Sequence, residues 1–244
     1  MEEHLQFKTP REPCPYLPNR EWTLDVRFVA EVHPDEHEAE LAAGRRRFGA
    51  TYFEPACAEC AECTPLRLVV ADFKPSRSQR RVLRRNNDVD LEIGTPTVDD
   101  ERLDLYQRFH QERHATVGWP APRTNLMEYF ESFVANVVPT HEFRYRLGGK
   151  LIALAYVDES PNAFSSQYAF HDPEYSRRSL GTFDVLTEVE TAVRWKKTHL
   201  YLGYYVRDCR SMAYKAQFKP YETLVEGRWC AARCSQPPSG PSAG

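Results

Sequence analysis

The 244-residue sequence lacks the features that mark a membrane or secreted protein. It contains no run of about 18 apolar residues, so no segment is expected to span a membrane. Residues 1–13 are polar and charged and lack the apolar core of a signal peptide, so we expect a cytoplasmic protein. The sequence shows no internal repeat, and neither a Ser-His-Asp nor a Cys-His arrangement is evident in it.

The sequence also lacks a strong excess of charge of one sign, since its formal net charge is only −3. Binding responds to local potential, however, and one basic face is enough if the acids lie elsewhere. Acids gather in 31–40 and 99–101, whereas 74–85 contains six Lys or Arg residues and no acid. This segregation of charge, rather than the net charge, indicates that the protein can bind a polyanionic partner.

The cysteines do not indicate a disulfide framework. There are seven of them, an odd number, in a chain without a secretion signal. Metal binding, redox sensitivity and buried reduced thiols remain as interpretations.

Breaks in the sequence pattern divide the chain into three parts, 1–96, 97–234 and a Ser/Pro/Gly-rich tail, 235–244, that we expect to be disordered. The short helix of the first part has a clear start, because Ser76 and Gln79 have the spacing of a capping box. Hydrophobic periodicity and turn signals predict the other elements. We expect helices over 34–47, 99–114, 124–138, 179–195 and 211–218, and strands over 21–32, 66–71, 89–93, 142–147, 151–158, 164–170, 199–205 and 222–229. The order of these elements predicts an α/β (α+β) fold, a mixed sheet with helices on both faces.

The clearest functional signal lies on the helix that follows Ser76. Four arginines at positions i, i+3, i+4 and i+7 place guanidinium groups on one helical face: Arg77, Arg80, Arg81 and Arg84. Arginine offers a fixed fork of donors that matches phosphate, so this face suits an RNA backbone. A solvated helix surface is the alternative, and the absence of nearby acids favours phosphate binding.

A cysteine triplet is the second signal. Cys57, Cys60 and Cys63 have CxxC spacing, and Cys14 upstream is a fourth thiol. Four thiolates can close a tetrahedral zinc site or hold an iron–sulfur cluster. A zinc ribbon has two separated CxxC pairs, which this chain lacks, and reduced thiols packed in a loop are the alternative.

Two further signals lie in the second half of the chain. A polar strand end, 165–173, precedes a turn and helix start that contain Arg177, Arg178, Ser179 and Gly181, and free N–H groups there can hold a phosphate or an oxyanion. An ordinary strand–turn–helix is the alternative. The aromatic segments 201–205 and 212–220 can stack a base or clamp an acyl chain, although core packing is the usual explanation of such residues.

These segments together resemble the bacterial aspartate/glutamate leucyltransferases, which are relatives of the eukaryotic arginyl-tRNA–protein transferases. The matching stretches are 14–17, 46–49, 57–67, 73–81, 172–173, 179–181, 201–204 and 212–220. The resemblance spans nearly the whole chain except the tail. It implies an N-terminal region with the cysteines and a C-terminal acetyltransferase-like (GNAT-like) domain.

The resemblance also implies an activity and partners. The enzyme would take leucine from leucyl-tRNA and add it to proteins beginning with Asp or Glu, which marks them for degradation in the N-degron (N-end rule) pathway. No cofactor is required for that chemistry. The four cysteines resemble the cluster-binding cysteines of the arginyl enzymes, but their spacing differs, so a zinc ion or iron–sulfur cluster is an open expectation.

On this hypothesis each candidate residue has a role. The four arginines hold the tRNA acceptor stem, and the turn from Arg177 to Gly181 holds its 3′ end. Tyr168 and Asp172 line the reacting centre, with Asp172 as the expected proton acceptor or amine orienter. Arg67 is the first candidate to bind the acidic side chain of the target. Lys215 is the second, and Tyr204 is expected to contact substrate.

Three rival functions remain open at this point. One is transfer of arginine instead of leucine, and another is acetyl-CoA-dependent N-acetylation by the second half. The acetyltransferase alternative leaves the arginine helix unexplained, and the usual Gly-rich pyrophosphate loop is absent. A third is a non-catalytic RNA-binding or redox-sensing protein built on the cysteine loop.

Overall fold

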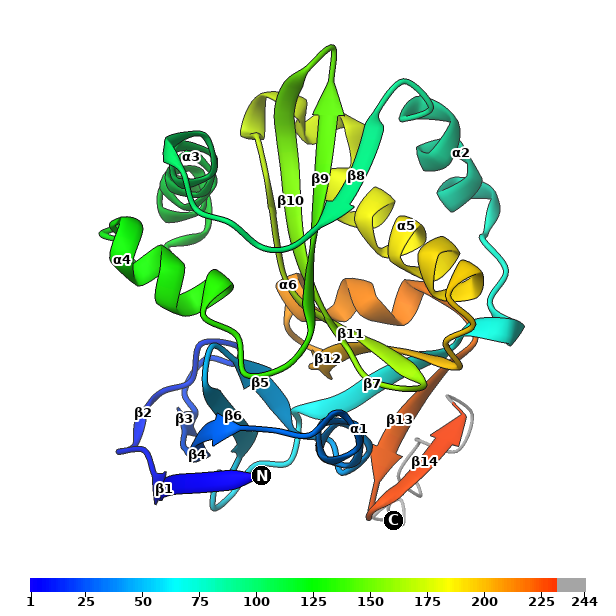
Figure 1. The fold of residues 1–244 in the computed structure, drawn as a ribbon. Helices are drawn as coiled ribbons and strands as arrows, with labels where there is room; N and C mark the ends of the chain where they lie inside the picture. The colour runs from blue at the N-terminus through cyan, green and yellow to red at the C-terminus, as the bar shows by residue number, and fades with distance from the viewer. Residues whose placement is uncertain (232–244) are drawn as a thin grey trace, which may run out of the picture.

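The computed structural model describes residues 1–231, and the predicted tail lies outside them. The chain forms a large sheet flanked by helices and a smaller sheet next to it (Figure 1). The smaller sheet has the strand order β1 (Glu2–Lys8), β4 (Leu24–Glu31), β6 (Thr51–Pro55) and β5 (Arg46–Phe48). A two-stranded ribbon joins β2 (Glu12–Pro13) to β3 (Glu21–Trp22), and helix α1 (Pro34–Ala42) follows β4.

The large sheet has eight strands, ordered β14 (Arg228–Ala231), β13 (Tyr221–Val225), β7 (Thr64–Val69), β12 (His199–Tyr205), β11 (Ala163–His171), β10 (Lys150–Glu159), β9 (Thr140–Leu147) and β8 (Asp90–Gly94). Strands β11 and β12 run parallel, and the other neighbouring pairs run antiparallel. The predicted mixed sheet is therefore confirmed. Strands β7 and β8 precede residue 96, so this sheet draws on both predicted parts of the chain.

Helices cover both faces of the large sheet (Figure 1). On one face, α5 (Leu180–Arg194) and α2 (Arg77–Arg85) pack over a core that includes Phe143 and Leu200. On the other face, α3 (Asp100–Val117) and α4 (Leu126–Tyr129) pack over a core that includes Leu154 and Phe170. The remaining helical segments are η1 (Val70–Asp72), η2 (Phe130–Val134), η3 (Pro173–Arg178), α6 (Arg210–Ala213) and η4 (Tyr214–Gln217).

Local sequence signals explain where several elements begin. The Ser76 hydroxyl accepts from the Gln79 N–H, and the Gln79 side chain accepts from the Ser76 N–H, so the predicted capping box at the start of α2 is confirmed. Asp99 caps α3 through the Arg102 N–H. Strand β12 occupies the predicted range, 199–205.

Other elements differ from the prediction. Helix α1 ends at Ala42, because the chain enters β5 within a few residues. The helix predicted over 124–138 is a short α4 followed by one π-helical segment, η2. The strand predicted over 222–229 is a hairpin, since Glu226 and Gly227 turn with positive φ angles of 49° and 75°.

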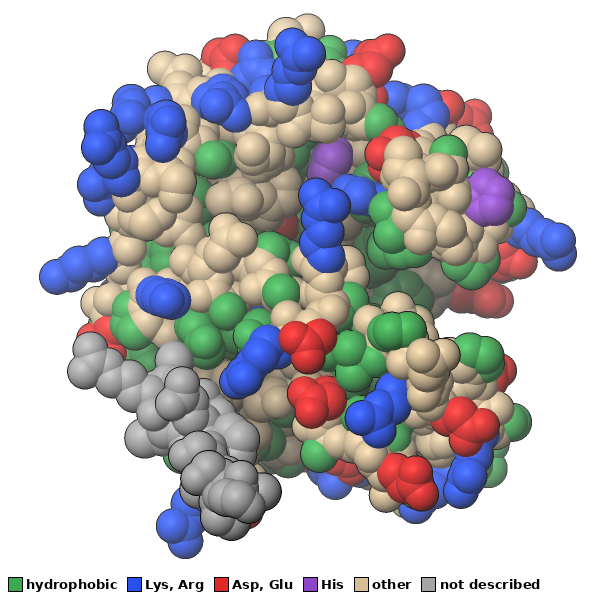
Figure 2. All heavy atoms as spheres, turned by 180° about the vertical axis from the view of Figure 1, so that it is seen from behind, with side chains coloured by type: hydrophobic (Ala, Val, Ile, Leu, Met, Phe, Trp, Pro, Cys, Tyr) green, Lys and Arg blue, Asp and Glu red, His purple; other side chains and the backbone are tan. Residues whose placement is uncertain are grey.

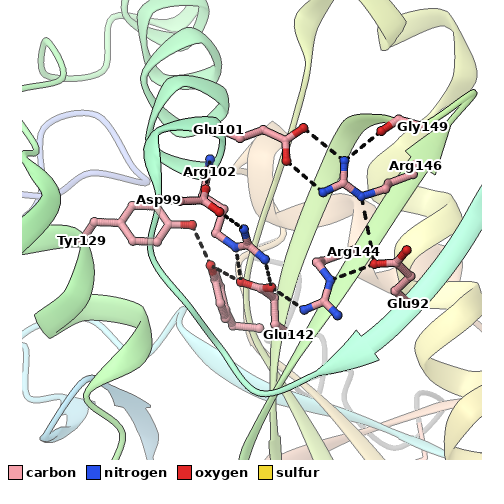
Figure 3. A network of polar contacts seen from close by, with 10 residues as sticks. Glu92, Asp99, Glu101, Arg102, Tyr129, Glu142, Arg144, Arg146 and Gly149 are labelled. Atoms are coloured by element: carbon pink, nitrogen blue, oxygen red, sulfur yellow. Dashed lines mark hydrogen bonds and ion pairs between the residues drawn. The ribbon is translucent and has the colours of Figure 1, made fainter.

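A polar network fixes α3 to the sheet (Figure 3). Glu142 is fully buried on β9, and both of its oxygens accept from the Arg102 guanidinium, at 3.0 and 2.8 Å. Arg144 and the Tyr156 hydroxyl also donate to Glu142, at 2.8 and 3.1 Å. A buried carboxylate that is paired and hydrogen-bonded in this way is satisfied, so its role is structural.

Candidate functional site

The four predicted RNA-binding arginines form one exposed surface on α2, which we call the arginine face: Arg77, Arg80, Arg81 and Arg84. Among residues 1–231, no carboxylate forms an ion pair with any of them. Lys and Arg side chains gather over α2 at the upper left of Figure 2. Because these guanidinium groups are exposed and have no carboxylate partner in the described chain, they remain available for an external anion.

The end of α2 is joined to the turn before α5. The Arg85 side chain donates to the Arg177 carbonyl, and the Asn86 amide donates to the Arg178 carbonyl at 3.0 Å. Arg178 itself is engaged by Asp88 through two bonds of 2.7 and 3.0 Å. The arginine face and the predicted anion turn are thus adjacent, but the guanidinium of Arg178 belongs to the connection between them, whereas Arg177 is exposed.

Helix α5 begins with an open first turn. Ser179 has a left-handed backbone with φ 59° and ψ 47°, and its side chain caps none of the helix N–H groups. Gly181 is exposed, and a Cβ built on it would meet nothing within 4 Å. The uncapped N–H groups at the start of this 15-residue helix favour an anion. This geometry is consistent with the anion site predicted at Ser179 and Gly181.

Tyr168 does not lie with the arginine face. It packs beside Phe48 and Phe133 on the α3 side of the sheet, opposite the α5 side. Its hydroxyl lies 3.0 Å from His110 Nε2, and burial raises the pKa of the Tyr168 hydroxyl. A tyrosine so placed is a core residue with one polar contact, which does not favour the predicted place in the reacting centre.

Asp172 is fully buried and already bonded. Its Oδ2 lies 2.7 Å from Arg108 and 3.0 Å from Lys150, while Oδ1 accepts from the Glu174 N–H at 3.1 Å. Burial alone would raise the pKa of Asp172, but Arg108 and Lys150 hold it below its usual value. These contacts are those of an ion pair that caps η3, and they argue against the predicted proton acceptor.

Arg67 is also engaged. Its Nε donates to Glu222 at 2.8 Å, its Nη1 donates to the Tyr201 hydroxyl at 3.1 Å, and its guanidinium stacks over Trp229 with its central carbon 4.2 Å from the ring centroid. A guanidinium neutralised by its own glutamate is a weak receptor for a second carboxylate. The structure therefore does not support Arg67 as the acid-binding residue.

Lys215 and Tyr204 lie together near the centre of the large sheet. The Lys215 ammonium donates to the Tyr204 carbonyl at 2.7 Å, and the Tyr204 hydroxyl donates to the Phe53 carbonyl at 3.1 Å. Burial, followed by the charge of Arg46, lowers the pKa of Lys215 to about 7. Within the described chain no carboxylate pairs with Lys215, so this prediction is still compatible with the geometry.

The predicted metal ligands come near one another without forming a ligand set. Burial and the neighbouring thiols raise the pKa of Cys63 to about 12, and those thiols include the other three predicted ligands and Cys209. In residues 1–231, however, no group of three or more Cys, His, Asp or Glu side chains has the arrangement that holds a metal ion. As placed, Cys14, Cys57, Cys60 and Cys63 do not fit a metal, and no chemical step is assigned to one.

Three residues absent from the sequence prediction of the site stand out by their environment. Arg46 is inserted where β11 and β12 separate, and Asp184 and Glu188 are buried on the sheet-facing side of α5. Burial raises the pKa of Asp184 to about 7. Burial and the charge of Asp184 raise the pKa of Glu188 well above its usual value. From helical spacing alone, such acids are predicted to lie on the surface. Their burial is visible only in the fold.

The fold and site define an α/β protein with an exposed, positively charged face beside an open helix N-terminus. Comparison with known proteins agrees with this class. A family model described as "Arginine-tRNA-protein transferase, N terminus" matches residues 12–81, and its C-terminal counterpart matches residues 101–225. The chain belongs to this family of aminoacyl-tRNA–protein transferases.

Curated relatives cover almost the whole chain. An aspartate/glutamate leucyltransferase of Pseudomonas fluorescens is 37% identical over 227 residues, 91% of this chain and 94% of the relative. The enzyme of the same name from Marinobacter nauticus is 39% identical over 225 residues, with the same shares covered. Among solved structures, FemX overlaps with a TM-score of 0.48 and 10% identity, over 80% of this chain and 67% of FemX.

The structure bears on one further expectation. No helix in the described part of the chain is long and apolar enough to cross a membrane.

Proposed function

We propose that the protein transfers leucine from leucyl-tRNA to the N-terminal Asp or Glu of acceptor proteins, and so marks them for degradation in the N-degron pathway. The relatives that share 37–39% identity over 91% of the chain carry that name and support the choice of donor and acceptor. We place the reaction in the cytoplasm, where aminoacyl-tRNA is available.

The arginine face is the observation that carries the proposal. Four exposed guanidinium groups without carboxylate partners stand next to the N-terminus of α5, which is joined to α2 through Asn86. An RNA backbone can contact the four guanidinium groups while its 3′-terminal phosphate lies at the helix start. A small-molecule acetyl donor would leave the arginine face without a ligand.

The reaction does not depend on a strong general base. The donor is an ester, and an N-terminal amine has an ordinary pKa of about 7.7–8.0, so a useful fraction is neutral at cellular pH. The amine nitrogen attacks the leucyl carbonyl, a C–N bond forms, and the C–O bond to the tRNA ribose breaks. The proton lost by the amine ends on the ribose oxygen. Alignment and stabilisation of the carbonyl oxygen therefore matter most, and the reaction needs no cofactor.

The residue roles follow from the described contacts. Arg77, Arg80, Arg81 and Arg84 hold the acceptor stem, and the backbone from Ser179 to Gly181 holds the 3′ end. Asp172 and Arg178 act indirectly, because their ion pairs fix η3 and α2 against the sheet. Lys215 lies beside the Tyr204 carbonyl on β12 and can hydrogen-bond to substrate.

Competition between labelled donors tests the proposal. Purified protein is incubated with an Asp-initiated peptide and one labelled donor at a time: leucyl-tRNA, arginyl-tRNA or acetyl-CoA. We expect label from leucyl-tRNA to appear on the peptide N-terminus. Label transferred from arginyl-tRNA alone would reassign the donor, and transfer from acetyl-CoA alone would reject the family mechanism for this chain.

A further inference from the structure

Strands β11 and β12 part near the centre of the large sheet. They pair over only three residues, Ala163–Ser165 with His199–Tyr201. Beyond this point β11 stays paired with β10, and β12 stays paired with β7. On β11 the pairing with β10 shifts by one residue at this point, so that Gln167 has no partner residue on β10. We call this opening the strand gap.

The Arg46 side chain fills the strand gap from the smaller sheet. Its guanidinium donates to the Ser165 hydroxyl at 2.9 Å and to the backbone carbonyls of Ser166 and Gln167. On the opposite side it packs on Gly203, where a Cβ would lie 2.8 Å from the Arg46 Nε. Gly203 also has a φ of +78°, so two independent constraints keep this position a glycine.

Arg46 differs from both of its neighbours in lacking a carboxylate. Arg45 pairs with Glu54 at 2.9 Å and with Glu40 at 3.1 Å, and the buried Arg47 pairs with Asp158. Among the described residues, by contrast, all the hydrogen-bond partners of Arg46 are neutral oxygens. Arg46 is half-buried and has no ion-pair partner among residues 1–231, so its positive charge is available to an anionic ligand.

Glu188 is the complementary case on α5. Its side chain is completely buried, and neither carboxylate oxygen has a hydrogen bond of normal geometry or an ion pair in the described chain, although the Ser166 side chain is close enough to lower its pKa. Asp184, one turn earlier, accepts from the Tyr145 hydroxyl at 2.7 Å and so is satisfied on one oxygen. The side chain of Gln167, which lies beside the carbonyls that Arg46 binds, is also unpartnered at both polar atoms.

These unpartnered groups belong to one place. Ser166 joins the two groups, because its backbone carbonyl accepts from Arg46. Burial and Asp184 raise the pKa of Glu188, whereas the Ser166 side chain and then the charge of Arg46 lower it, so all three residues are close together. Tyr214 is 38% exposed, so its side chain reaches the surface. Burial, followed by the charges of Asp184 and Glu188, raises the pKa of Tyr214, so this side chain lies next to the carboxylate pair.

We infer that Arg46 and Glu188 form the receptor for the first residue of the acceptor protein, with Arg46 binding its side-chain carboxylate and Glu188 its α-amino group. The inference rests on the proposed function. N-terminal Asp and Glu share one feature, a carboxylate and an amine a few bonds apart. On one side the strand gap places a guanidinium that has no carboxylate partner in the described chain, and on the other a buried carboxyl group, which an incoming ammonium would ionise. The bound amine would then lie at the opening between β11 and β12, beside the middle of α5 and about two helical turns from its start.

Acceptor selectivity tests the role of Arg46. Leucine transfer is measured with two peptides that differ only in an N-terminal Asp or Asn, because Asn has the same shape and no charge. We expect Arg46→Gln to raise the KM for the Asp peptide about 10- to 100-fold, the loss of a charge-assisted bond. The ratio of kcat/KM for Asp over Asn should fall towards one. The matched control, Arg45→Gln, removes a neighbouring arginine that has its own glutamates and should keep the native ratio.

Glu188→Gln tests the amine side independently. The variant should raise the KM for Asp and Asn peptides by the same factor, about tenfold or more, and leave their ratio unchanged. The affinity for leucyl-tRNA should stay native in both variants. Thermal unfolding checks that each variant folds, and if Arg46→Gln does not fold, Glu188→Gln decides the question alone.

The outcomes separate this inference from the proposed function. If the wild-type protein moves leucine to no peptide, the proposed function fails. If the wild-type protein is active but Arg46→Gln keeps its preference for Asp, or Glu188→Gln keeps its native KM, the receptor is refuted and the transferase activity stands.

Discussion

Two buried glutamates, one on strand β9 and one on helix α5, have opposite surroundings. Glu142, on the α3 side, receives hydrogen bonds from Arg102, Arg144 and Tyr156 (Figure 3). Glu188, on the α5 side, is as deeply buried and receives none of normal geometry within the described chain. The same contrast separates Arg45 and Arg47, which have carboxylates, from Arg46. Paired charges join elements of this fold, and we infer that the unpaired ones are kept for substrate.

The largest effect is expected where a paired charge is broken. Glu142→Gln removes the buried counter-charge of the Arg102 guanidinium and leaves it only the half-exposed Asp99, and we expect a loss of about 3 kcal/mol in the free energy of unfolding. Urea denaturation measures it. Leucine transfer by the protein that remains folded should be close to native, because the network lies on the α3 face. A loss of activity without a loss of stability would break the comparison.

The arginine face should give the next largest effect, and on binding rather than stability. Replacing Arg77, Arg80, Arg81 and Arg84 with Gln should weaken tRNA binding on the order of 100-fold at low salt. The slope of the logarithm of the tRNA association constant against the logarithm of the salt concentration should become shallower by about three, since fewer counterions are released. Fluorescence anisotropy with labelled tRNA measures both.

The control for the arginine face is a pair of exposed arginines on other elements, Arg11→Gln and Arg228→Gln. This pair should leave the salt slope native. Equal losses in the two sets of variants would mean that the arginine face attracts tRNA only as part of the general surface charge.

The smallest effect concerns pH. Burial raises the pKa of Asp184 to about 7, whereas an unfolded aspartate titrates near about 3.9. The folded state then binds more protons between these values, so this contribution to stability is complete below pH ~4 and is lost as the pH rises to ~7. Asp184→Asn should therefore reduce the fall in Tm between pH 5 and pH 7.5 by a few degrees. Asp208→Asn, at an exposed position, is the control and should leave the fall in Tm unchanged. If the Tm of Asp184→Asn falls as much as that of the native protein, Asp184 is ionised in the folded state.

Local features of the sequence predicted the parts of the fold that depend on local interactions. The start of α2 follows from Ser76 and Gln79, three residues apart, and the exposure of the arginine face follows from helical spacing on a short polar helix. Strand β12 and the mixed sheet also follow from hydrophobic patterning. Strands β1, β5 and β6 were not predicted, because they are short or polar and are defined by pairing partners.

The environment of the site residues depends on long-range pairing, which the sequence does not show. Arg67 looked available because its partner, Glu222, lies 155 residues further along the chain. Asp172 looked available because Arg108 and Lys150 come from α3 and β10. Conversely, Arg46 stands between two arginines that are paired, and no local pattern distinguishes it from them.

The unfolding free energy and acceptor KM of Glu188→Gln, measured on the same preparation, test the central claim most directly. If Glu188 is unpartnered because it awaits a substrate amine, neutralising it should leave stability at least native and raise the KM about tenfold or more. A loss of stability as large as that of Glu142→Gln, with a native KM, would contradict the account and make Glu188 a structural residue.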